Sequence, residues 1–306
     1  MARVIINPNR QFRPIDVVIP FAYNGLKGNS GMNAKELTLR IVSLSDVLLH
    51  EEVEARRVER LISHLTSDWL LKNPPIVAQF DGKYIVLDGA TRTTALKRIA
   101  CRDIIVQIVD YDSPAIVLET WNHLLLDLPE RDLFDALERV PGLRIQATSV
   151  DGAAGELEQR ASLCSILLAD GRAFSLFGRG GSLPAQAETL NQVVAAYEGR
   201  GEMYRVAHTN VERLLAEHGR LSALVAFPCF RPDDIRRVTL SGHKLPMGIT
   251  RHIIPGRVLH INIPLAILER DESLESKNAW LDDWMETRMH ERHVRFYQEP
   301  VFLFDE

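Results

Sequence analysis

The feature that most constrains the fold is a β-rich segment that passes directly into a helical pattern at Asp88-Gly89. Two β-rich runs, 76–80 and 83–87, are separated by an Asp-Gly pair, which is favoured by a two-residue type I′ hairpin turn. Apolar residues then return with helical spacing over 90–99, and a β-rich run follows over 104–109. We therefore predict a hairpin, a helix and a further strand in succession.

An amphipathic helix is predicted ahead of this hairpin. Four apolar residues after Val53 recur at i, i+3, i+4 and i+7, with charged residues on the opposite face: Val58, Leu61, Ile62 and Leu65. Asn73-Pro74-Pro75 ends the pattern, because proline cannot continue a helix. Together these elements predict one compact domain over residues 37–112.

The regions on either side of this predicted domain have different sequence patterns. Residues 1–36 contain three prolines and a turn-rich Asn-Gly stretch, which predicts an irregular arm with a flexible loop. Residues 113–306 predict a single, larger mixed α+β domain, and the fold class is therefore α+β. Its predicted helices cover 115–125, 131–139, 184–197, 209–218 and 274–291. Its predicted strands cover 162–169, 172–177, 221–227, 249–254 and 257–263.

Composition and charge exclude several classes of protein. The formal net charge of -5 divides into +2 over residues 1–112 and -7 over 113–306, unlike the concentrated basic surface of a dedicated DNA-binding domain. The three cysteines lie far apart and form no Cys-x-x-Cys pair, so neither a disulfide framework nor a cysteine zinc site is indicated. There is no apolar run long enough to span a bilayer and no signal-peptide core, so we expect a cytoplasmic protein without membrane contact.

The Asp-Gly turn is the strongest local signal for chemistry. A helix that starts there presents unpaired backbone N–H groups and the positive end of its dipole, a favourable place for a phosphate group. Arg92 adds a planar donor fork, Asp88 could hold Mg²⁺ or orient a hydroxyl, and threonine hydroxyls add further donors. The predicted phosphate-binding residues are Gly89, Ala90, Thr91, Arg92, Thr93 and Thr94. The turn alone leaves a second interpretation open, in which Asp88 only caps the helix and Arg92 makes a surface ion pair.

Two further segments carry candidate residues. Glu51 and Glu52 precede the first amphipathic helix; they could complement its dipole, or one could act as a carboxylate base if this region faces the Asp88 turn. A Gly- and Pro-punctuated segment over 241–257 contains His243, Thr250, Arg251 and His252, which could hold a carboxylate or phosphate group or lie in a solvated hairpin. Trp121 and His123, on the predicted helix 115–125, are weaker candidates for lining a cleft.

These motifs carry a family resemblance. The order His-Glu, amphipathic helix, Asn-Pro-Pro-Ile-Val hairpin and Leu-Asp-Gly-Ala-Thr-Arg-Thr-Thr-Ala-Leu-Lys resembles the ParB/sulfiredoxin fold, in which a Gly-x-x-Arg turn binds nucleotide phosphate. Within that superfamily it is most similar to the free-serine kinases, including the type that supplies O-phospho-L-serine for staphyloferrin B biosynthesis. The resemblance implies phosphoryl transfer from ATP or ADP, with Mg²⁺, to a small hydroxy acid, most plausibly L-serine. It implies Glu51 or Glu52 as the base, with Asp88, and the Thr250 to His252 segment on the substrate side.

The sequence departs from the family pattern at one informative point. Free-serine kinases typically have Asp-Gly-His-His-Arg where this chain has Asp-Gly-Ala-Thr-Arg, which puts in doubt any role of those histidines. The turn also lacks the catalytic cysteine of sulfiredoxin, so sulfinic acid repair is disfavoured. The alternative function is a ParB-like regulator that binds nucleotide or DNA without kinase activity. Whether the protein forms a homodimer stays open.

Overall fold

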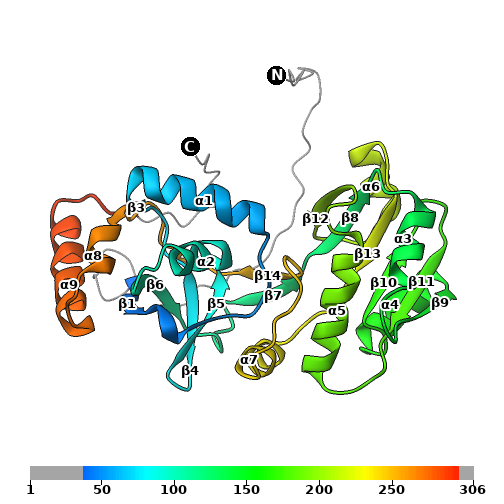
Figure 1. Ribbon diagram of the computed structural model, residues 1–306, viewed down its shortest axis with the longest axis horizontal. Helices are drawn as coiled ribbons and strands as arrows, with labels where there is room; N and C mark the ends of the chain where they lie inside the picture. Colours follow the sequence, from blue (N-terminus) through cyan, green and yellow to red (C-terminus); the bar gives the residue numbers. More distant parts are fainter. Residues whose placement is uncertain (1–36, 296–306) are drawn as a thin grey trace. The chain divides into compact units, whose positions relative to one another are not determined.

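The computed structural model describes residues 37–295, which form a mixed α+β architecture with several sheets, as predicted (Figure 1). The predicted arm over 1–36 lies outside the described residues. No helix within 37–295 is long and apolar enough to cross a membrane.

The first sheet has five strands and contains the predicted hairpin. In spatial order the strands are β1 (Leu39–Ser43), β6 (Asp103–Val109), β4 (Ile76–Phe80), β5 (Lys83–Asp88) and β2 (Val47–Leu49). Asp81 and Gly82 have φ values of 47° and 75°, so both central residues of the hairpin turn have positive φ, as a type I′ turn requires. Two helices, α1 (Ala55–Asp68) and α2 (Ala90–Arg98), pack against each other beside this sheet.

The second sheet has six strands that pair antiparallel throughout. Their order is β12 (Glu202–Val206), β8 (Asn122–Leu126), β13 (Ala223–Ala226), β10 (Cys164–Leu167), β11 (Ala173–Phe177) and β9 (Arg144–Thr148). The accompanying helices are α3 (Glu130–Leu137), α4 (Val150–Glu158), α5 (Leu183–Tyr197), α6 (Val211–His218) and α7 (Pro232–Leu240). Three of these helices, α3, α5 and α6, were predicted from the sequence, whereas α4 and α7 were not.

Two short strand pairs complete the topology. The pair β7 (Val117–Thr120) and β14 (Thr250–Ile253) joins a segment just after the first sheet to one 130 residues later in the chain. The pair β3 (Leu70–Leu71) and β15 (Ile263–Pro264) brings the chain back to the first sheet.

The predicted helix over 115–125 is wrong, because this segment forms β7 and β8. All five residues of β8 are buried, since the strand lies between β12 and β13 and is covered on both faces. A short apolar run of this kind has the same periodicity in a buried strand as in a buried helix, and long-range pairing decides between them. Trp121 and His123 therefore lie on extended chain rather than on a helix.

The predicted strand over 257–263 is also largely wrong, since only Ile263 of this range pairs in a ladder. Backbone N–H groups of this segment donate to side chains instead of to a neighbouring strand. Val258 N donates to Gln107 Oε1 at 2.9 Å, and His260 N donates to Asn73 Oδ1 at 2.8 Å. His260 and Asn262 have positive φ, which interrupts an extended conformation.

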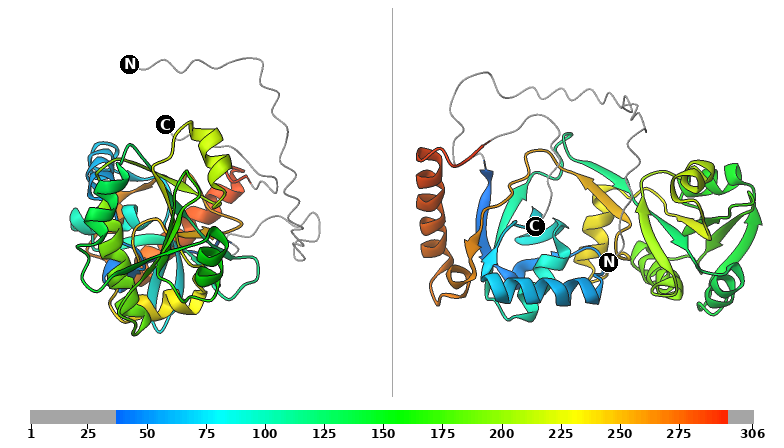
Figure 2. Two further views of the ribbon diagram at one scale, coloured as in Figure 1. Left: turned by 90° about the vertical axis from the view of Figure 1, so that its right-hand side faces the viewer. Right: turned by 90° about the horizontal axis from the view of Figure 1, so that it is seen from above.

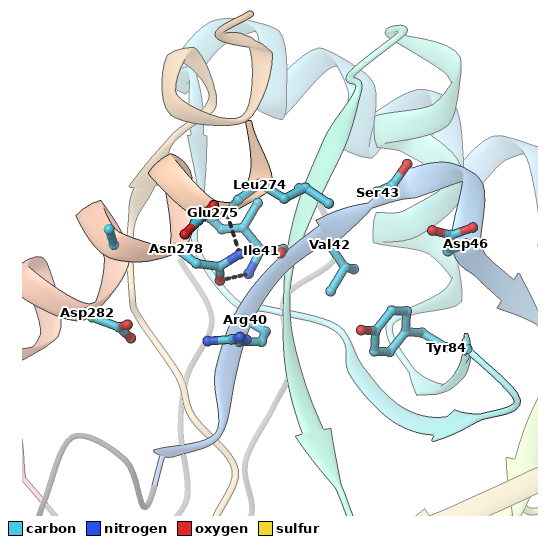
Figure 3. Close-up of a pocket in the computed structure, with 12 residues that line it drawn as sticks. Arg40, Ile41, Val42, Ser43, Asp46, Tyr84, Leu274, Glu275, Asn278 and Asp282 are labelled. Carbon is cyan, nitrogen blue, oxygen red and sulfur yellow. Dashed lines mark hydrogen bonds between the residues drawn. The ribbon is translucent and has the colours of Figure 1, made fainter. Parts of the chain in front are cut away.

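The last helices, α8 (Leu265–Glu269) and α9 (Leu274–His290), pack on the first sheet, beside β6 and β1 respectively (Figure 2). Asn278 of α9 holds the outer edge of β1, because its Oδ1 accepts from Ile41 N and its Nδ2 donates to Ile41 O (Figure 3). The apolar core around β1 and β6 accordingly includes buried residues from the range 261–285, among them Leu265 and Leu281. The domain division at residue 113 stays a prediction, and this core contains residues from both sides of it.

A buried ion pair fixes α9 to the sheet. Lys277 Nζ lies 2.6 Å from Asp103 Oδ2, with the two side chains 1% and 3% exposed, and also donates to Leu268 O at 2.9 Å. Removing one partner of such a pair leaves an uncompensated buried charge.

We expect Lys277→Ala to lower the free energy of unfolding by about 3 to 5 kcal/mol, because Asp103 would remain buried without its counter-charge. Lys72→Ala, which removes an exposed i,i+4 pair with Asp68, is the matched control and should change it by less than about 0.5 kcal/mol. Urea denaturation of both variants measures this, and equal effects would contradict the assignment.

Candidate active site

The two acidic candidates lie at the ends of neighbouring parallel strands. β2 and β5 pair in parallel with Leu49 opposite Val86, so Glu51 and Asp88 each follow the last paired residue by two positions. Adjacent strands lie about 4.8 Å apart, which places both backbones at the same edge of the sheet. The sequence analysis made a carboxylate base conditional on this region facing the Asp88 turn, and the register places the Glu51 and Asp88 backbones at one edge.

The Asp-Gly turn has the predicted strand-to-helix form. β5 ends at Asp88, Gly89 has φ 98°, and α2 starts at Ala90 without a side-chain cap from the described residues. A Cβ at residue 89 would lie 2.9 Å from both Arg92 Nη2 and Pro75 Cβ, so the position requires glycine. The first turn of α2 is thus an uncapped helix N-terminus beside a guanidinium, suited to an anionic ligand.

The threonines of this turn are arranged differently from one another. The hydroxyls of Thr93 and Thr94 donate to the carbonyls of Gly89 and Ala90, at 3.2 and 2.8 Å, which uses their protons within α2. Thr91 is half-buried and its hydroxyl has no hydrogen-bond partner among the described residues. Of the three hydroxyls, that of Thr91 is therefore best placed to meet a ligand.

Asp88 lies between two arginines. Its Oδ2 accepts from Arg92 Nη2 at 2.7 Å and also from Arg257 Nη2, while Oδ1 bonds to no described residue. Two guanidinium groups therefore meet at one carboxylate in front of the uncapped helix. Such an arrangement favours a phosphate group.

The Glu51 carboxylate is bound by the loop that precedes β14. Oε2 accepts from Gly248 N at 2.9 Å; Oε1 accepts from Ile249 N at 3.2 Å and from Thr250 N and Oγ1 at 2.7 and 2.6 Å. Glu51 and Leu245 also form an isolated parallel β-bridge. The segment over 241–257 and the residues that follow β2 thus meet at this carboxylate.

The side chains of Glu52 and His243 pair with other residues than those around Glu51. The carboxylate of Glu52 is exposed and lies 3.2 Å from Lys244 Nζ. His243 Nε2 lies 3.2 Å from Glu188 Oε1 of α5, and its Nδ1 contacts Ser241. The prediction left Glu51 and Glu52 open as alternatives, and the geometry favours Glu51.

Two histidines surround Thr250. His50 Nδ1 lies 2.5 Å from Val86 O, and its Nε2 lies 2.7 Å from Thr250 Oγ1. His252 packs edge-on to the His50 ring at 5.3 Å and receives a hydrogen bond from the hydroxyl of Tyr111 at 2.7 Å. Burial lowers the pKa of His252 well below its ordinary value, and the nearby His50 lowers it further, so His252 stays neutral.

Trp121 and Arg251 form a pair beside this group. The guanidinium carbon of Arg251 lies 4.5 Å from the ring centroid of Trp121, and Arg251 Nη1 lies 3.1 Å from Glu119. Both residues are part-exposed, so a ligand can reach them. His123 is fully buried and cannot line a cleft directly; its Nε2 donates to Gly248 O at 3.3 Å and its Nδ1 accepts from Tyr197.

Sequence reasoning missed Arg205, which reaches Gly248 from β12. The guanidinium packs flat on this glycine, since a Cβ at residue 248 would lie 2.0 Å from Arg205 Nε. The guanidinium of Arg205 makes no hydrogen bond or ion pair with another residue of the described range. Its pKa is lowered mainly by burial, while Glu51 acts in the opposite direction. No motif marks this arginine, because its position depends on the pairing of β12 with β8.

Two hollows lie in the described part of the chain, and one of them adjoins the site through Tyr111, which bonds to His252. One of about 500 Å³ is between β1 and α9, lined by Arg40, Tyr84 and Asn278 among others (Figure 3). The other, of about 730 Å³, is lined by Phe80, Tyr111 and Arg236 among others. Neither is lined by a residue predicted for the site.

Comparisons with known proteins find L-serine kinases over most of the chain. No protein-family profile matches the chain. The ATP-dependent L-serine kinase SbnI of Staphylococcus aureus is 26% identical over 276 residues, covering 90% of this chain and all of SbnI. The ADP-dependent L-serine kinase SerK of Thermococcus kodakarensis is 19% identical over 76% of this chain and 93% of SerK. The solved structure of a free serine kinase in complex with AMP superposes with a TM-score of 0.66 at 17% identity, covering 76% of this chain and 94% of that one.

The homologues named across most of the chain are ATP- or ADP-dependent L-serine kinases. The chain is a homologue of the free serine kinase and SbnI family.

We expect the buried His123 to make stability depend on pH. Burial lowers its pKa to about 4 from 6.5, so between these values the unfolded chain binds the proton more tightly than the folded protein. Stability should therefore fall as pH decreases from 6.5 to 4, by up to about 3 kcal/mol from this residue.

His123→Gln should remove that part of the pH dependence, measured as urea unfolding curves from pH 4 to 7. His64→Gln, at an exposed position of α1, is the control. Parallel pH profiles for wild type and His123→Gln would contradict the expectation.

Proposed function

We propose that the protein transfers a phosphoryl group from ATP or ADP to L-serine and forms O-phospho-L-serine. The observation that carries this proposal is the position of Glu51 and Asp88 at one edge of the sheet, beside the uncapped start of α2. The named activities of the homologous kinases support the choice of substrate and donor.

Within this proposal, residues 37–112 form a ParB/sulfiredoxin-like nucleotide-binding domain. The N–H groups at the start of α2, Gly89 to Thr91, bind the donor phosphates, and Arg92 with Arg257 balances their charge. The serine hydroxyl oxygen bonds to the terminal phosphorus, the bond from phosphorus to the bridging oxygen of the nucleotide breaks, and Glu51 takes the hydroxyl proton. The threonine and arginine of the loop, Thr250 and Arg251, lie on the substrate side.

The residues present fit a magnesium ion that arrives with the nucleotide. Mg²⁺ is commonly held by one or two carboxylates together with phosphate oxygens. Asp88 offers one oxygen, Oδ1, that no described residue occupies, although Oδ2 is taken by two arginines. Asp88 would hold the ion, which would supply positive charge to the phosphates. No group of three or more ligating side chains exists among residues 37–295, so a metal cage independent of nucleotide is not proposed.

The direct trial is incubation of the purified protein with Mg²⁺, L-serine and each nucleotide in turn, with O-phosphoserine detected by mass spectrometry. We expect product from ATP or from ADP, and a fall in kcat of at least about 100-fold in Glu51→Gln, because the base is lost. Glu52→Gln should stay within about threefold of wild type. Absence of product with both nucleotides would refute the kinase proposal, and salt-sensitive binding of duplex DNA would then favour the regulator.

We also propose that Arg205 binds the carboxylate of the substrate. Its guanidinium lies on Gly248, next to Glu51, and is unpaired within the described residues. A part-desolvated guanidinium gains most from a carboxylate, which it can bind in a bidentate manner.

Arg205→Gln should raise the KM for L-serine by about 10- to 100-fold with the KM for nucleotide within about threefold. Arg205→Lys should have a KM for L-serine between those of wild type and Arg205→Gln, since lysine keeps the positive charge but lacks the planar guanidinium. Arg213→Gln, an exposed arginine of α6 paired with Glu217, is the control. If the KM for nucleotide rises instead, Arg205 binds phosphate and the carboxylate assignment is wrong.

A further inference from the structure

Four polar groups form a continuous hydrogen-bonded chain that ends at Glu51. In order, they are the carbonyl of Val86, the imidazole of His50, the hydroxyl of Thr250 and the carboxylate of Glu51, with contacts of 2.5, 2.7 and 2.6 Å. His50 is 3% exposed and Thr250 is 7% exposed. Water therefore has little access to the middle of this chain, and protons must be exchanged between the groups themselves.

The number of protons in the chain follows from its chemistry. The Val86 carbonyl can only accept, so Nδ1 of His50 carries a proton. The contacts from Nε2 to Oγ1 and from Oγ1 to Glu51 Oε1 each need one more, which makes three. A neutral imidazole brings one proton, the Thr250 hydroxyl one, and an ionised carboxylate none. All three hydrogen bonds can therefore form only when the chain holds one additional proton.

The hydrogen bonds around the chain point to Nε2 of His50 as the place for that proton. Three backbone N–H groups, of residues 248 to 250, already bind the Glu51 carboxylate and stabilise its negative charge. Arg205 lies on the same side of Glu51 and favours the same charge. His252 packs against His50 but already accepts a hydrogen bond from Tyr111 on Nε2, and burial opposes a charge on it. Glu52 and Lys244 pair with each other at the surface.

We propose that His50 and Thr250 extend Glu51 into a proton relay, in which His50 is the final acceptor of the proton that leaves the substrate hydroxyl. The proposal rests on the proposed kinase function. As the serine oxygen bonds to phosphorus, its proton passes to Glu51, the Glu51 proton passes to Thr250 Oγ1, and the Thr250 proton passes to His50 Nε2. The bond to the nucleotide's bridging oxygen breaks with its electron pair, and the imidazole is left with two protons.

This arrangement is complementary to the state after proton removal. In molecules whose His50 is neutral before the reaction, the chain holds two protons for three contacts, and one contact is incomplete. After the reaction all three hydrogen bonds are formed, so the network stabilises the charge distribution that develops during phosphoryl transfer. His50 acts through Thr250 and Glu51 and is in this sense a positioning residue for the base.

The shared proton can be tested in the free protein, without turnover. Nitrogen-15 spectra of the imidazole rings at neutral pH should show a fraction of doubly protonated His50 that is at least threefold larger in wild type than in Glu51→Gln or Thr250→Val. Thr250→Ser should restore the wild-type fraction. An equal fraction in all four proteins would overturn the relay, even if the protein proved not to be a kinase.

A double-mutant cycle tests the relay in catalysis. Thr250→Val and His50→Gln should each lower kcat by about 10- to 100-fold with the KM for nucleotide within about threefold, and the double variant should be no slower than the slower single variant. Thr250→Ser should recover activity to within about threefold. A double variant whose losses multiply would show that the two residues act independently and would refute the relay.

Controls for these variants lie outside the site. His64→Gln repeats the histidine change at an exposed position of α1, and Thr239→Val repeats the loss of a buried hydroxyl in α7. Thermal unfolding of every variant shows whether a fall in kcat reflects loss of the fold. If wild type forms no O-phosphoserine, the kinase function fails, and the imidazole spectra still decide whether the proton is shared.

Discussion

The site depends on one interaction, the binding of the Glu51 carboxylate by the loop over residues 248–250. This carboxylate follows β2 of the first sheet, whereas the loop begins β14, almost 200 residues later. Four hydrogen bonds to one charged group give the loop a defined position, and charge-assisted bonds of this kind are stronger than neutral ones. Thr250, Arg251 and His252 are brought near the Asp88 turn because Glu51 binds this loop.

Gly248 is the point at which three parts of the chain meet. Its N–H donates to Glu51 and its carbonyl accepts from the buried His123. The guanidinium of Arg205 packs against its α-carbon. Its φ of 65° lies in the left-handed region, and a Cβ would overlap Arg205. His123 and Arg205 belong to the second sheet, and both contact the site at this glycine.

The sequence predicts local structure well where the signal is local. The type I′ turn at Asp81-Gly82 and the strand-to-helix turn at Asp88-Gly89 each depend on a few adjacent residues, and both are confirmed. The segment 115–125 was assigned to a helix because a run buried on both faces has no strand periodicity. Arg205 had no signal at all, since its contact with Gly248 depends on the antiparallel pairing of β12 and β8. The roles assigned to Glu51, Asp88 and the Gly89 to Arg92 turn stay predictions.

The hydrogen bonds of Glu51 place a physical demand on its function as a base. Oε1 of Glu51 already accepts three hydrogen bonds and Oε2 accepts one, so a proton taken from the substrate must compete with these donors. Catalysis by such a group is efficient only if the proton moves on to a better acceptor during the reaction. The nearest nitrogen that can take the proton is Nε2 of His50, which is reached through the Thr250 hydroxyl. Nε2 of His252 is already paired with the Tyr111 hydroxyl. The same loop that orients Glu51 by binding it also supplies, through the Thr250 hydroxyl, the path by which the proton can leave.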